Sequence, residues 1–553
     1  MKKILIFLLF AISLNADIAT ATTDFMQKDF KITLSWLQEK PKSPAKDFFI
    51  IQYLNQEENL SFEEAKTVYD MRYGKNASLD KLFNQRYKKN IPEEDLKCYR
   101  ASIEELKNSD VRCIALGLSL KEASLLSKKD LEFFINKLDS YPTLKNNLKL
   151  ISSTDPFNSF INSGTKKFLQ LFFELEDSYT IKYLNKELPL DFLTKLTQEA
   201  DFNRFLRTII FSKDFPNIQK SLFALNSIKT FTPDIDFILG INAINNNNNP
   251  TIAKNFFLTS FNKTNQRDMK DKAAFWLYLV TKENYYLEEL AKSWDNSLYV
   301  LYAKELLNIK PDNIIYNLET KNKKSSYDIY NAFDWLNVVE DTKTNLDDIK
   351  LQKYSNIFTD ENTMPHLAFV LERYNKSKIQ YFITPYKDII GKYNIYKQIL
   401  LYSLARQESR FIPSSISVSS ALGVMQIMPF LSLDISQKLN EDYNIYEQFV
   451  PKKNIEYASF HLDTLMTQFD NNPLFIAYAY NGGGGYTKGQ LKKGLFKEKG
   501  KFEPFLSMEL ISSGETREYG KKVLANFYIY NNYLNSENKI SLSTILQNLV
   551  SPY

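Results

Sequence analysis

Residues 404–429 read LARQESRFIPSSISVSSALGVMQIMP, and this stretch carries the most specific information in the chain. A mostly apolar run precedes it and predicts a helix that ends before Pro413. Leu400, Leu404 and Glu408 are spaced four residues apart, which places the carboxyl group on the helix stripe predicted to be buried. A carboxyl group in poor solvent has a raised pKa, and this suits a general acid near neutral pH.

Three further motifs follow this glutamate in order. They are GVMQ at 423–426, AYNGG at 479–483 and ETREY at 515–519. Together with the Glu-Ser pair at 408–409, they give the order E-S, G-x-M-Q, A-Y-N-x-G and E-T-x-x-Y. This order resembles the catalytic domain of the family 1 soluble lytic murein transglycosylases, and the match spans roughly residues 380–530.

The resemblance implies a periplasmic enzyme with a goose-type-lysozyme-like fold that cuts peptidoglycan. It implies that Glu408 protonates the oxygen of the MurNAc-β-1,4-GlcNAc bond and then acts as base on the muramoyl C6 hydroxyl. Attack of C6–O on C1 gives a 1,6-anhydro ring, so this lyase uses one carboxyl group where most glycosidases use two. We expect neither a cofactor nor a metal. Two alternatives stay open: a hydrolytic muramidase, and an inert wall-binding scaffold.

The motif match also implies a set of residues that bind the substrate. These are Ser417, Gly423, Gln426, Met428, Tyr480, Asn481 and Glu515. Ser417 lies nine residues after Glu408 and is expected near the substrate's acetamido group, although an ordinary loop serine has the same signature. Tyr480 is expected to donate a hydrogen bond near the acid or to stack on a sugar, the alternative being a core aromatic. Gly423 is expected to let the backbone approach the sugar.

The sequence lacks the motifs that other common catalytic mechanisms require. His366 and His461 are the only histidines, and no G-x-S-x-G motif surrounds a serine, which argues against a Ser-His-Asp hydrolase. No H-E-x-x-H or paired metal-ligand spacing is present. The glycine run 482–485 is not a P-loop, because Lys488 is followed by Gly489 instead of Ser or Thr. It is predicted to be a turn that ends a helix beginning at Asn472-Pro473.

Glycine is distributed unevenly along the 553 residues. Only four of the 15 glycines precede Gly391. The glycine-poor part, rich in Leu, Lys, Glu, Phe and Tyr, is predicted to be helical, and the remainder to form a compact domain with shaped loops. We therefore predict an all-α protein. The expected domains are a signal peptide (1–16), an α-superhelical domain (17–305), a helical linker domain (306–379) and a lysozyme-like catalytic domain (380–553). The resemblance implies that they close into a ring or partial ring.

Within the first part, apolar residues recur at helical spacing. The pattern in residues 271–308 predicts short antiparallel helices broken near 282–284 and 295–297. Residues 186–211 show the same helical spacing of apolar residues. No strict repeat period is found, so the prediction is an irregular superhelix. Asn245–Asn249, followed by Pro250, is predicted to be a loop between helices.

The N-terminus resembles a secretion signal. Lys2 and Lys3 precede the apolar run 4–14, and Ala16 offers a small residue for cleavage. An uncleaved anchor is the alternative, but the run is short for a spanning helix. We therefore expect a periplasmic protein that does not span the membrane once the signal is removed.

Two cysteines, Cys98 and Cys113, are present in the chain. An exported protein reaches an oxidising compartment, where a disulfide between them is permitted. Two separately buried thiols are the alternative.

The charge balance favours no particular partner, with 70 Lys and Arg against 65 Asp and Glu and a net charge of +5. Residues 488–501 are a local exception, with Lys488, Lys492 and Lys493 at their start. A solvated loop is one interpretation, and contact with the acidic stem peptides of a cell-wall glycan is the other. We expect a monomer that acts on glycan strands and does not bind nucleic acid, because no recognisable nucleic-acid module surrounds the lysines.

Overall fold

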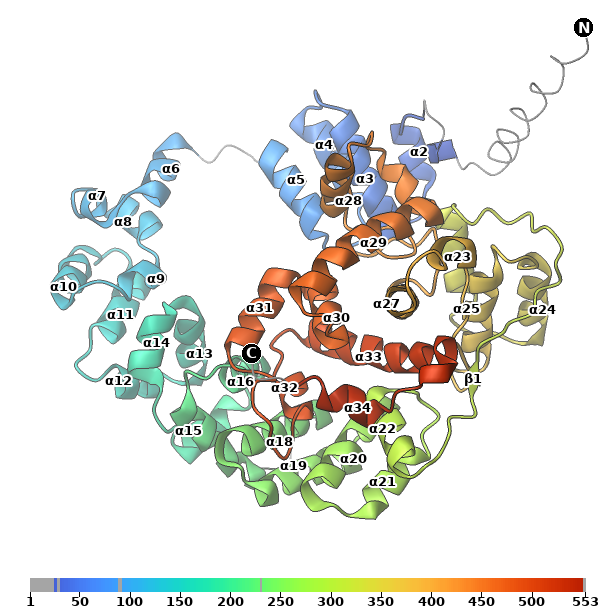
Figure 1. The fold of residues 1–553 in the computed structure, drawn as a ribbon. Coiled ribbons are helices and arrows are strands. Elements are labelled where there is room, and N and C mark those ends of the chain that lie inside the picture. The colour runs from blue at the N-terminus through green and yellow to red at the C-terminus, as the bar shows by residue number, and fades with distance from the viewer. Residues whose placement is uncertain (1–23, 27–29, 88–91, 229–230, 551–553) are drawn as a thin grey trace, which may run out of the picture. The chain divides into compact units, whose positions relative to one another are not determined.

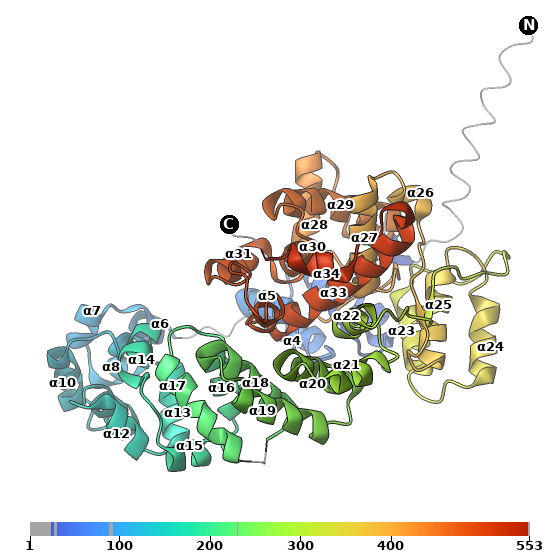
Figure 2. The ribbon, with the colours of Figure 1, turned by 60° about the horizontal axis from the view of Figure 1, so that its bottom comes forward.

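The computed structural model describes residues 24–26, 30–87, 92–228 and 231–550. Helices make up most of this part of the chain (Figures 1 and 2). Its only strands are Ile314–Ile315 (β1) and Gln380–Tyr381 (β2), which pair in parallel. The predicted all-α class is confirmed. The predicted signal peptide, residues 1–16, lies outside the described residues, and none of the described helices is long and apolar enough to cross a bilayer.

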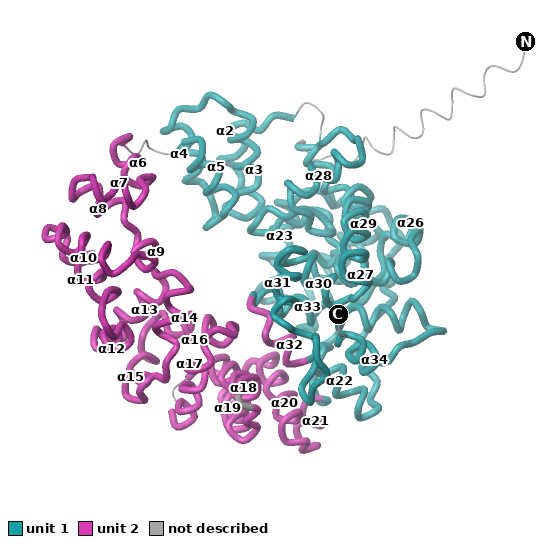
Figure 3. The backbone as a smooth tube through the Cα atoms, turned by 60° about the vertical axis from the view of Figure 1, so that its left-hand side comes forward, with its two compact units in different colours: residues 1–88, 291–504, 513–553 teal, residues 89–290, 505–512 magenta. Residues whose placement is uncertain are grey.

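The chain divides into two compact units, which Figure 3 distinguishes by colour. Unit 1 comprises residues 1–88, 291–504 and 513–553, and unit 2 comprises residues 89–290 and 505–512. These units are defined by which parts of the chain contact each other, and their limits differ from the domain boundaries expected from the sequence. Those domain boundaries stay a prediction.

Unit 2 is a succession of short helices. They are Glu93–Arg100 (α6), Ile103–Lys107 (α7), Val111–Gly117 (α8), Leu120–Ala123 (α9), Lys128–Lys137 (α10), Pro142–Ile151 (α11), Pro156–Asn162 (α12), Thr165–Glu174 (α13), Asp177–Leu184 (α14), Leu190–Leu196 (α15), Phe202–Ile210 (α16), Pro216–Ser221 (α17), Leu222–Ser227 (η2), Pro233–Asn247 (α18), Pro250–Lys263 (α19), Arg267–Thr281 (α20), Asn284–Ala291 (α21) and Phe505–Glu509 (α32). The buried faces of the helices from α7 to α19 form one apolar cluster, from Leu106 to Phe256. Serine caps begin several helices, and Ser102 and Ser119 each form a capping box with a glutamate three residues later.

The helix breaks expected in residues 271–308 are confirmed. Helix α20 ends at Thr281, α21 ends at Ala291, and the next helix begins at Leu298. The expected loop at Asn245–Asn249 is wrong in extent, because α18 continues to Asn247. Asn248 then adopts a left-handed conformation with φ 45°, and the Asn249 side chain caps α19. Asparagine suits both positions, so two residues suffice for the turn.

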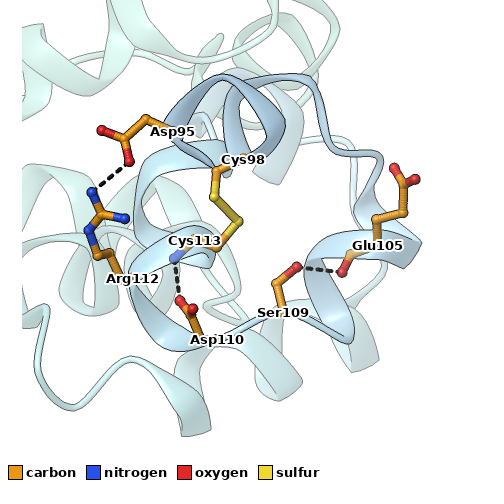
Figure 4. Close-up of a disulfide and its surroundings, with 7 residues drawn as sticks. All are labelled: Asp95, Cys98, Glu105, Ser109, Asp110, Arg112 and Cys113. Carbon is orange, nitrogen blue, oxygen red and sulfur yellow. Dashed lines mark hydrogen bonds and ion pairs between the residues drawn. A yellow bond between two sulfur atoms is a disulfide. The ribbon is translucent and has the colours of Figure 1, made fainter. Parts of the chain in front are cut away.

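Cys98 and Cys113 form a disulfide that joins α6 to α8, with their Cα atoms 5.1 Å apart (Figure 4). Close by, Arg112 makes an ion pair with Asp95 at 2.5 Å. The Asp110 carboxylate caps α8 by accepting the Cys113 N–H at 2.7 Å. The disulfide interpretation therefore holds over that of two separate thiols.

Unit 1 contains the remaining elements. They are Asp24–Met26 (η1), Leu34–Glu39 (α2), Pro44–Gln56 (α3), Phe62–Tyr69 (α4), Ala77–Tyr87 (α5), Leu298–Leu306 (α22), Ala332–Asp341 (α23), Asp348–Ile357 (α24), Met364–Tyr374 (α25), Lys387–Ile390 (α26), Ile395–Glu408 (α27), Pro429–Leu439 (α28), Ile445–Phe449 (η3), Pro451–Gln468 (α29), Pro473–Gly482 (α30), Gly484–Lys492 (α31), Gly514–Leu534 (α33), Ser536–Asn538 (η4) and Leu542–Gln547 (α34), besides β1 and β2. Helix α33 packs against both α27 and α30, and these three helices carry three of the four sequence motifs.

The N-terminal helices α2–α5 share an apolar core with a segment far along the chain. Phe48 and Phe49 of α3 belong to the same buried cluster as Phe333, Leu422 and Phe449. The Phe49 ring stacks on Phe333 with ring centroids 5.7 Å apart. Leu422 lies in the loop between α27 and α28 (residues 409–428, the motif loop). This loop therefore packs against helices that precede it by more than 300 residues.

Candidate active site

Glu408 is the last residue of α27. Leu400 and Leu404, two turns and one turn before it, are fully buried, as their spacing predicts. Ser409 follows as the C-cap, and its hydroxyl donates to the Val424 carbonyl at 2.6 Å. The Glu-Ser pair thus joins the end of the helix to the G-x-M-Q motif.

A buried ion pair fixes helix α27 one half-turn before the acid. The Arg406 guanidinium donates to the Glu372 carboxylate at 3.0 Å, to the Tyr381 carbonyl at 3.1 Å and to Asn526 at 3.2 Å. Burial lowers the pKa of Arg406 to about 10, so this group remains charged at neutral pH. Such a network stabilises one orientation of the helix because breaking either half would leave a charge buried without a partner.

Glu408 itself is partly exposed, and its carboxylate Oε1 accepts a hydrogen bond from the Tyr519 hydroxyl at 2.5 Å. Burial of the carboxyl group raises its pKa to about 7. The Tyr519 hydrogen bond acts in the opposite direction, and the charge of Glu515 raises the pKa further. At neutral pH, both the protonated and the ionised form are therefore populated, as a group that gives and then takes a proton requires.

Two tyrosines flank the acid. Burial and the charge of Glu408 raise the pKa of both Tyr480 and Tyr519 well above the usual value, so both hydroxyls keep their protons. The Tyr480 hydroxyl donates to the Met425 carbonyl at 2.8 Å, and Tyr480 is partly exposed. Tyr480 therefore holds the motif loop beside the acid, while Tyr519 contacts the acid directly.

The motif loop needs glycine at position 423. Gly423 has φ +78°, and a Cβ there would lie 2.1 Å from the Gln448 carbonyl oxygen. Gln426 also has a positive φ, of 49°, and its side-chain amide donates to the carbonyls of Ser415 and Gly423 at 3.0 and 2.9 Å. This amide nitrogen thus stabilises the loop, and Gln426 remains partly exposed.

Asn454 of α29 stabilises the same loop through side-chain hydrogen bonds. Its fully buried side chain accepts the Met425 N–H at 2.7 Å and donates to the Leu422 carbonyl at 3.1 Å. It also donates to the Gln448 side chain at 3.0 Å. Neither Asn454 nor Gln448 belongs to a sequence motif.

Ser417 and Met428 lie on either side of this loop and are partly exposed. The Ser417 hydroxyl accepts the Ala421 N–H at 2.9 Å and so closes a turn. The loop is also held by Asn76, whose amide donates to the Val418 carbonyl at 3.0 Å. Met428 is the N-cap of α28.

Asn481 and Glu515 connect the third and fourth motifs. The Asn481 amide donates to the Glu515 carboxylate at 3.2 Å, and its oxygen accepts the Thr516 hydroxyl at 2.8 Å. Asn481 lies near the end of α30, which begins with Asn472 as N-cap as predicted. Glu515 lies in the first turn of α33 and is exposed.

Among the residues expected to bind substrate, Gly423 is buried and the others are partly or fully exposed. Their roles toward a ligand stay predictions. Sequence reasoning left Tyr519 out of the site, although it ends the E-T-x-x-Y motif and touches Glu408. Lys488, Lys492 and Lys493 are exposed. The expected loop is wrong at the start of this segment, because Lys488 and Lys492 lie on helix α31, and contact with stem peptides stays a prediction.

In the described part of the chain, no cluster of His, Cys, Asp or Glu has the arrangement of a metal site. His366 is fully buried between the rings of Tyr327, Trp335 and Phe358 and lies outside the acid's surroundings. Burial lowers its pKa to about 3, so it is neutral.

Residues 387–502 match the family described as Transglycosylase SLT domain. The chain contains a domain of this family. The SLT domain includes Glu408 and the first three motifs, whereas the fourth motif follows it. The family resemblance found in the sequence is thereby confirmed.

Curated relatives agree with this assignment. The chain is 28% identical over 218 residues to the soluble lytic murein transglycosylase of Escherichia coli K12, covering 38% of this chain and 33% of that protein. It is 32% identical over 158 residues to the enzyme of the same name from Salmonella typhimurium, covering 28% and 24%. The matched segment thus spans a third or less of these relatives.

Solved structures give weaker likenesses. An inactive mutant of the lytic transglycosylase Slt from Pseudomonas aeruginosa aligns with 92% of this chain and 84% of its own, at 15% identity and a TM-score of 0.44. The soluble lytic transglycosylase SLT70 from Escherichia coli gives the same coverage at 18% identity and a TM-score of 0.43.

Proposed function

We propose that the chain is a lytic transglycosylase that cleaves the MurNAc-β-1,4-GlcNAc bond of peptidoglycan and leaves 1,6-anhydro-MurNAc ends. The observation that carries the proposal is the environment of Glu408. This glutamate lies in a transglycosylase SLT domain, its pKa is raised to about 7 by burial, and one tyrosine hydroxyl contacts its carboxylate.

The first step uses the protonated acid. Glu408 transfers its proton to the glycosidic oxygen while the bond from this oxygen to C1 of MurNAc breaks. The leaving GlcNAc keeps the proton as a hydroxyl group, and positive charge develops at C1. The hydrogen bond from Tyr519 favours the carboxylate that forms, because it lowers the pKa of Glu408.

The second step uses the carboxylate produced by the first. It removes the proton from the C6 hydroxyl as the C6 oxygen forms a bond to C1, which closes the anhydro ring. Glu408 ends protonated, so no net proton is consumed and no water is added. One carboxyl group with a pKa near neutrality can serve both steps, because neither of its forms is rare at pH 7.

Glu515 is the carboxyl group whose charge acts on Glu408, and it fits a structural role better than that of a second catalytic group. It is exposed, and Asn481 binds it at 3.2 Å. This favours the lyase over the hydrolytic muramidase, in which a second group would activate water. The inert scaffold is disfavoured because a wall-binding protein has no need of a carboxyl group whose pKa burial raises to about 7.

The remaining assignments belong to the same proposal. Ser417, Gly423, Gln426, Met428, Tyr480 and Asn481 line the binding site for the glycan, with Glu515 at its edge. The protein acts in the periplasm as a monomer, and Lys488, Lys492 and Lys493 contact stem peptides. The catalytic domain covers residues 380–553, preceded by the linker and superhelical domains predicted from the sequence.

The mass of the product tests the reaction. Purified protein is incubated with peptidoglycan sacculi in water enriched in ¹⁸O, and the released fragments are analysed by mass spectrometry. We expect anhydro ends, lighter by one water than reducing ends and free of the heavy isotope. Predominantly reducing ends labelled with ¹⁸O would make the protein a muramidase, and the absence of fragments would favour the scaffold.

A further inference from the structure

A groove of about 550 Å³ lies in unit 1 where the N-terminal helices meet the start of α28. Its size is that of sites for small organic ligands. Helix α3 contributes Gln52 and Asn55, α5 contributes Ser78, and the other wall includes Met428, Phe430 and Tyr443. None of the residues that line the groove is charged, although 24% of the chain is Asp, Glu, Lys or Arg.

Phe430 gives the groove an unusual surface. It lies in the first turn of α28 and is 70% exposed, more than any other aromatic residue among the large exposed apolar side chains. Leu433, one turn later, is 40% exposed. A phenylalanine ring so open to water presents a flat apolar face, and exposed apolar surface rimmed by polar groups is typical of ligand-binding grooves.

The opposite wall supplies amide groups. The side chains of Gln52 and Asn55 have no hydrogen-bond partner in the described part of the chain, and Asn55 is exposed. Each amide offers two donors and an acceptor. A flat apolar face opposite unpaired, uncharged donors and acceptors matches the chemistry of a pyranose ring, with its apolar face and its ring of hydroxyl groups.

The groove adjoins the residues expected to bind substrate. Met428 belongs to this expected set and also lines the groove, and Ser419 and Ser420 of the groove lining follow Ser417 in the turn that its hydroxyl closes. Asn76, which precedes α5, donates to the Val418 carbonyl at 3.0 Å and so ties this turn to the N-terminal helices. A glycan strand that leaves the site past Met428 would enter this groove.

We infer that the groove is a further glycan-binding subsite, in which a neutral sugar unit away from the cleaved bond stacks on Phe430 and is hydrogen-bonded by Gln52 and Asn55. The inference rests on the proposed function and extends it to the N-terminal helices. The occupant is the carbohydrate and not the stem peptide, because the lining offers no charge to an acidic peptide. Long strands therefore bind more tightly than short ones.

Kinetics of the Phe430→Ala variant test this subsite. On long, peptide-free glycan strands we expect KM to rise about five- to tenfold with little change in kcat, the size of effect that truncating a central aromatic contact produces. On a fragment too short to reach the groove, the variant should equal the wild type. Leu439→Ala is the matched control, since Leu439 lies on the same helix, is 38% exposed and does not line the groove.

A second pair of measurements separates this inference from the proposed function. Phe430→Trp keeps an aromatic face, so it should retain tight binding of long glycan. If Phe430 had only a structural role, binding would not depend on whether the side chain at this position is aromatic. Binding of long glycan to the Glu408→Gln protein, with and without Phe430→Ala, needs no turnover. Tight binding that is lost with the ring supports the subsite. If, in addition, the wild-type protein binds long glycan but releases no product, the proposed function is refuted while the subsite stands.

Two results would overturn the inference while leaving the function intact. One is cleavage and binding of long strands that Phe430→Ala leaves unchanged. The other is a dimer in solution that Phe430→Ala dissociates, which would make a second copy of the chain the occupant. Wild-type protein that neither cleaves nor binds glycan would refute both proposals.

Discussion

The helical array of unit 2 and the motif-bearing part of unit 1 are both built of helices, but different interactions hold them together. In the array, the buried cluster from Leu106 to Phe256 is apolar, and some of its aromatic rings pack edge to face, as Phe168 does on Phe205. Around the motifs, buried polar groups such as Arg406, Asn454 and Asn526 make directed hydrogen bonds. The first arrangement tolerates exchange of similar side chains, whereas the second requires particular atoms at particular positions.

The largest expected effect concerns the acid. The Glu408→Gln variant keeps the shape of the side chain but cannot deliver a proton, so turnover of peptidoglycan should fall by about 10²–10⁴-fold. The matched control is Glu441→Gln, since Glu441 is an exposed glutamate of the same unit that pairs with Lys453. Equal turnover in the Glu408→Gln variant and the wild type would show that another residue is the acid.

The same variant can be checked for folding through its pH dependence. The folded-state pKa of Glu408 is raised to about 7 from 4.5, so its ionisation in the folded protein costs stability as pH rises through this range. Glutamine escapes this cost. The variant should therefore melt at a higher temperature than the wild type at pH 8, and the difference should vanish toward pH 4.5.

The next largest effect concerns the backbone of the motif loop. Gly423→Ala places a methyl group against the Gln448 carbonyl and strains a residue at φ +78°. We expect a loss of about 3 kcal/mol or more in the free energy of unfolding. It is measured by titrating the protein with denaturant while a spectroscopic signal from unit 1 is followed. Gly485→Ala is the control, because nothing lies within 4 Å of a Cβ built there. Equal stability of the two variants would show that the loop relaxes freely.

The Tyr519→Phe variant should have a moderate effect. It removes the hydroxyl that donates to Glu408 at 2.5 Å and lowers the pKa of this acid. The pKa of Glu408 should rise, and turnover at pH 7 should fall about tenfold because the carboxylate formed in the first step loses its donor. The readout is the pH dependence of kcat/KM, whose descending limb should move to higher pH. A fall in rate without this movement would assign Tyr519 a purely structural role.

The smallest effect is expected in the array. Phe205 is fully buried and contacts the rings of Phe168 and Phe172. Phe205→Leu keeps an apolar side chain of similar size, so it should cost about 1 kcal/mol of unfolding free energy and leave turnover unchanged. A loss as large as that of Gly423→Ala would remove the contrast between the two regions.

The sequence predicted what depends on neighbours along the chain. The helix that ends at Glu408 followed from the spacing of Leu400 and Leu404, and the start of α30 followed from Asn472. The run of asparagines was misjudged because composition alone does not reveal that Asn248 and Asn249 suffice for the turn.

Contacts between distant residues were beyond such reasoning. Tyr519 reaches Glu408 across 111 residues, and Arg406 pairs with Glu372 across 34. The Asn76 amide donates to the Val418 carbonyl across 342 residues. The sequence therefore did not predict that the N-terminal helices stabilise this loop. Only the three-dimensional fold brings these groups together, since no local pattern distinguishes them from solvated side chains.

The pH dependence of kcat/KM tests the central claim most directly, namely that burial gives Glu408 the pKa that lets one carboxyl group act as both acid and base. Because the free enzyme must carry the proton, the rate on peptide-free glycan strands should fall as pH rises through about 7, where Glu408 ionises. A descending limb near the ordinary glutamate pKa of 4.5, or a rate that stays constant to pH 9, would contradict the account.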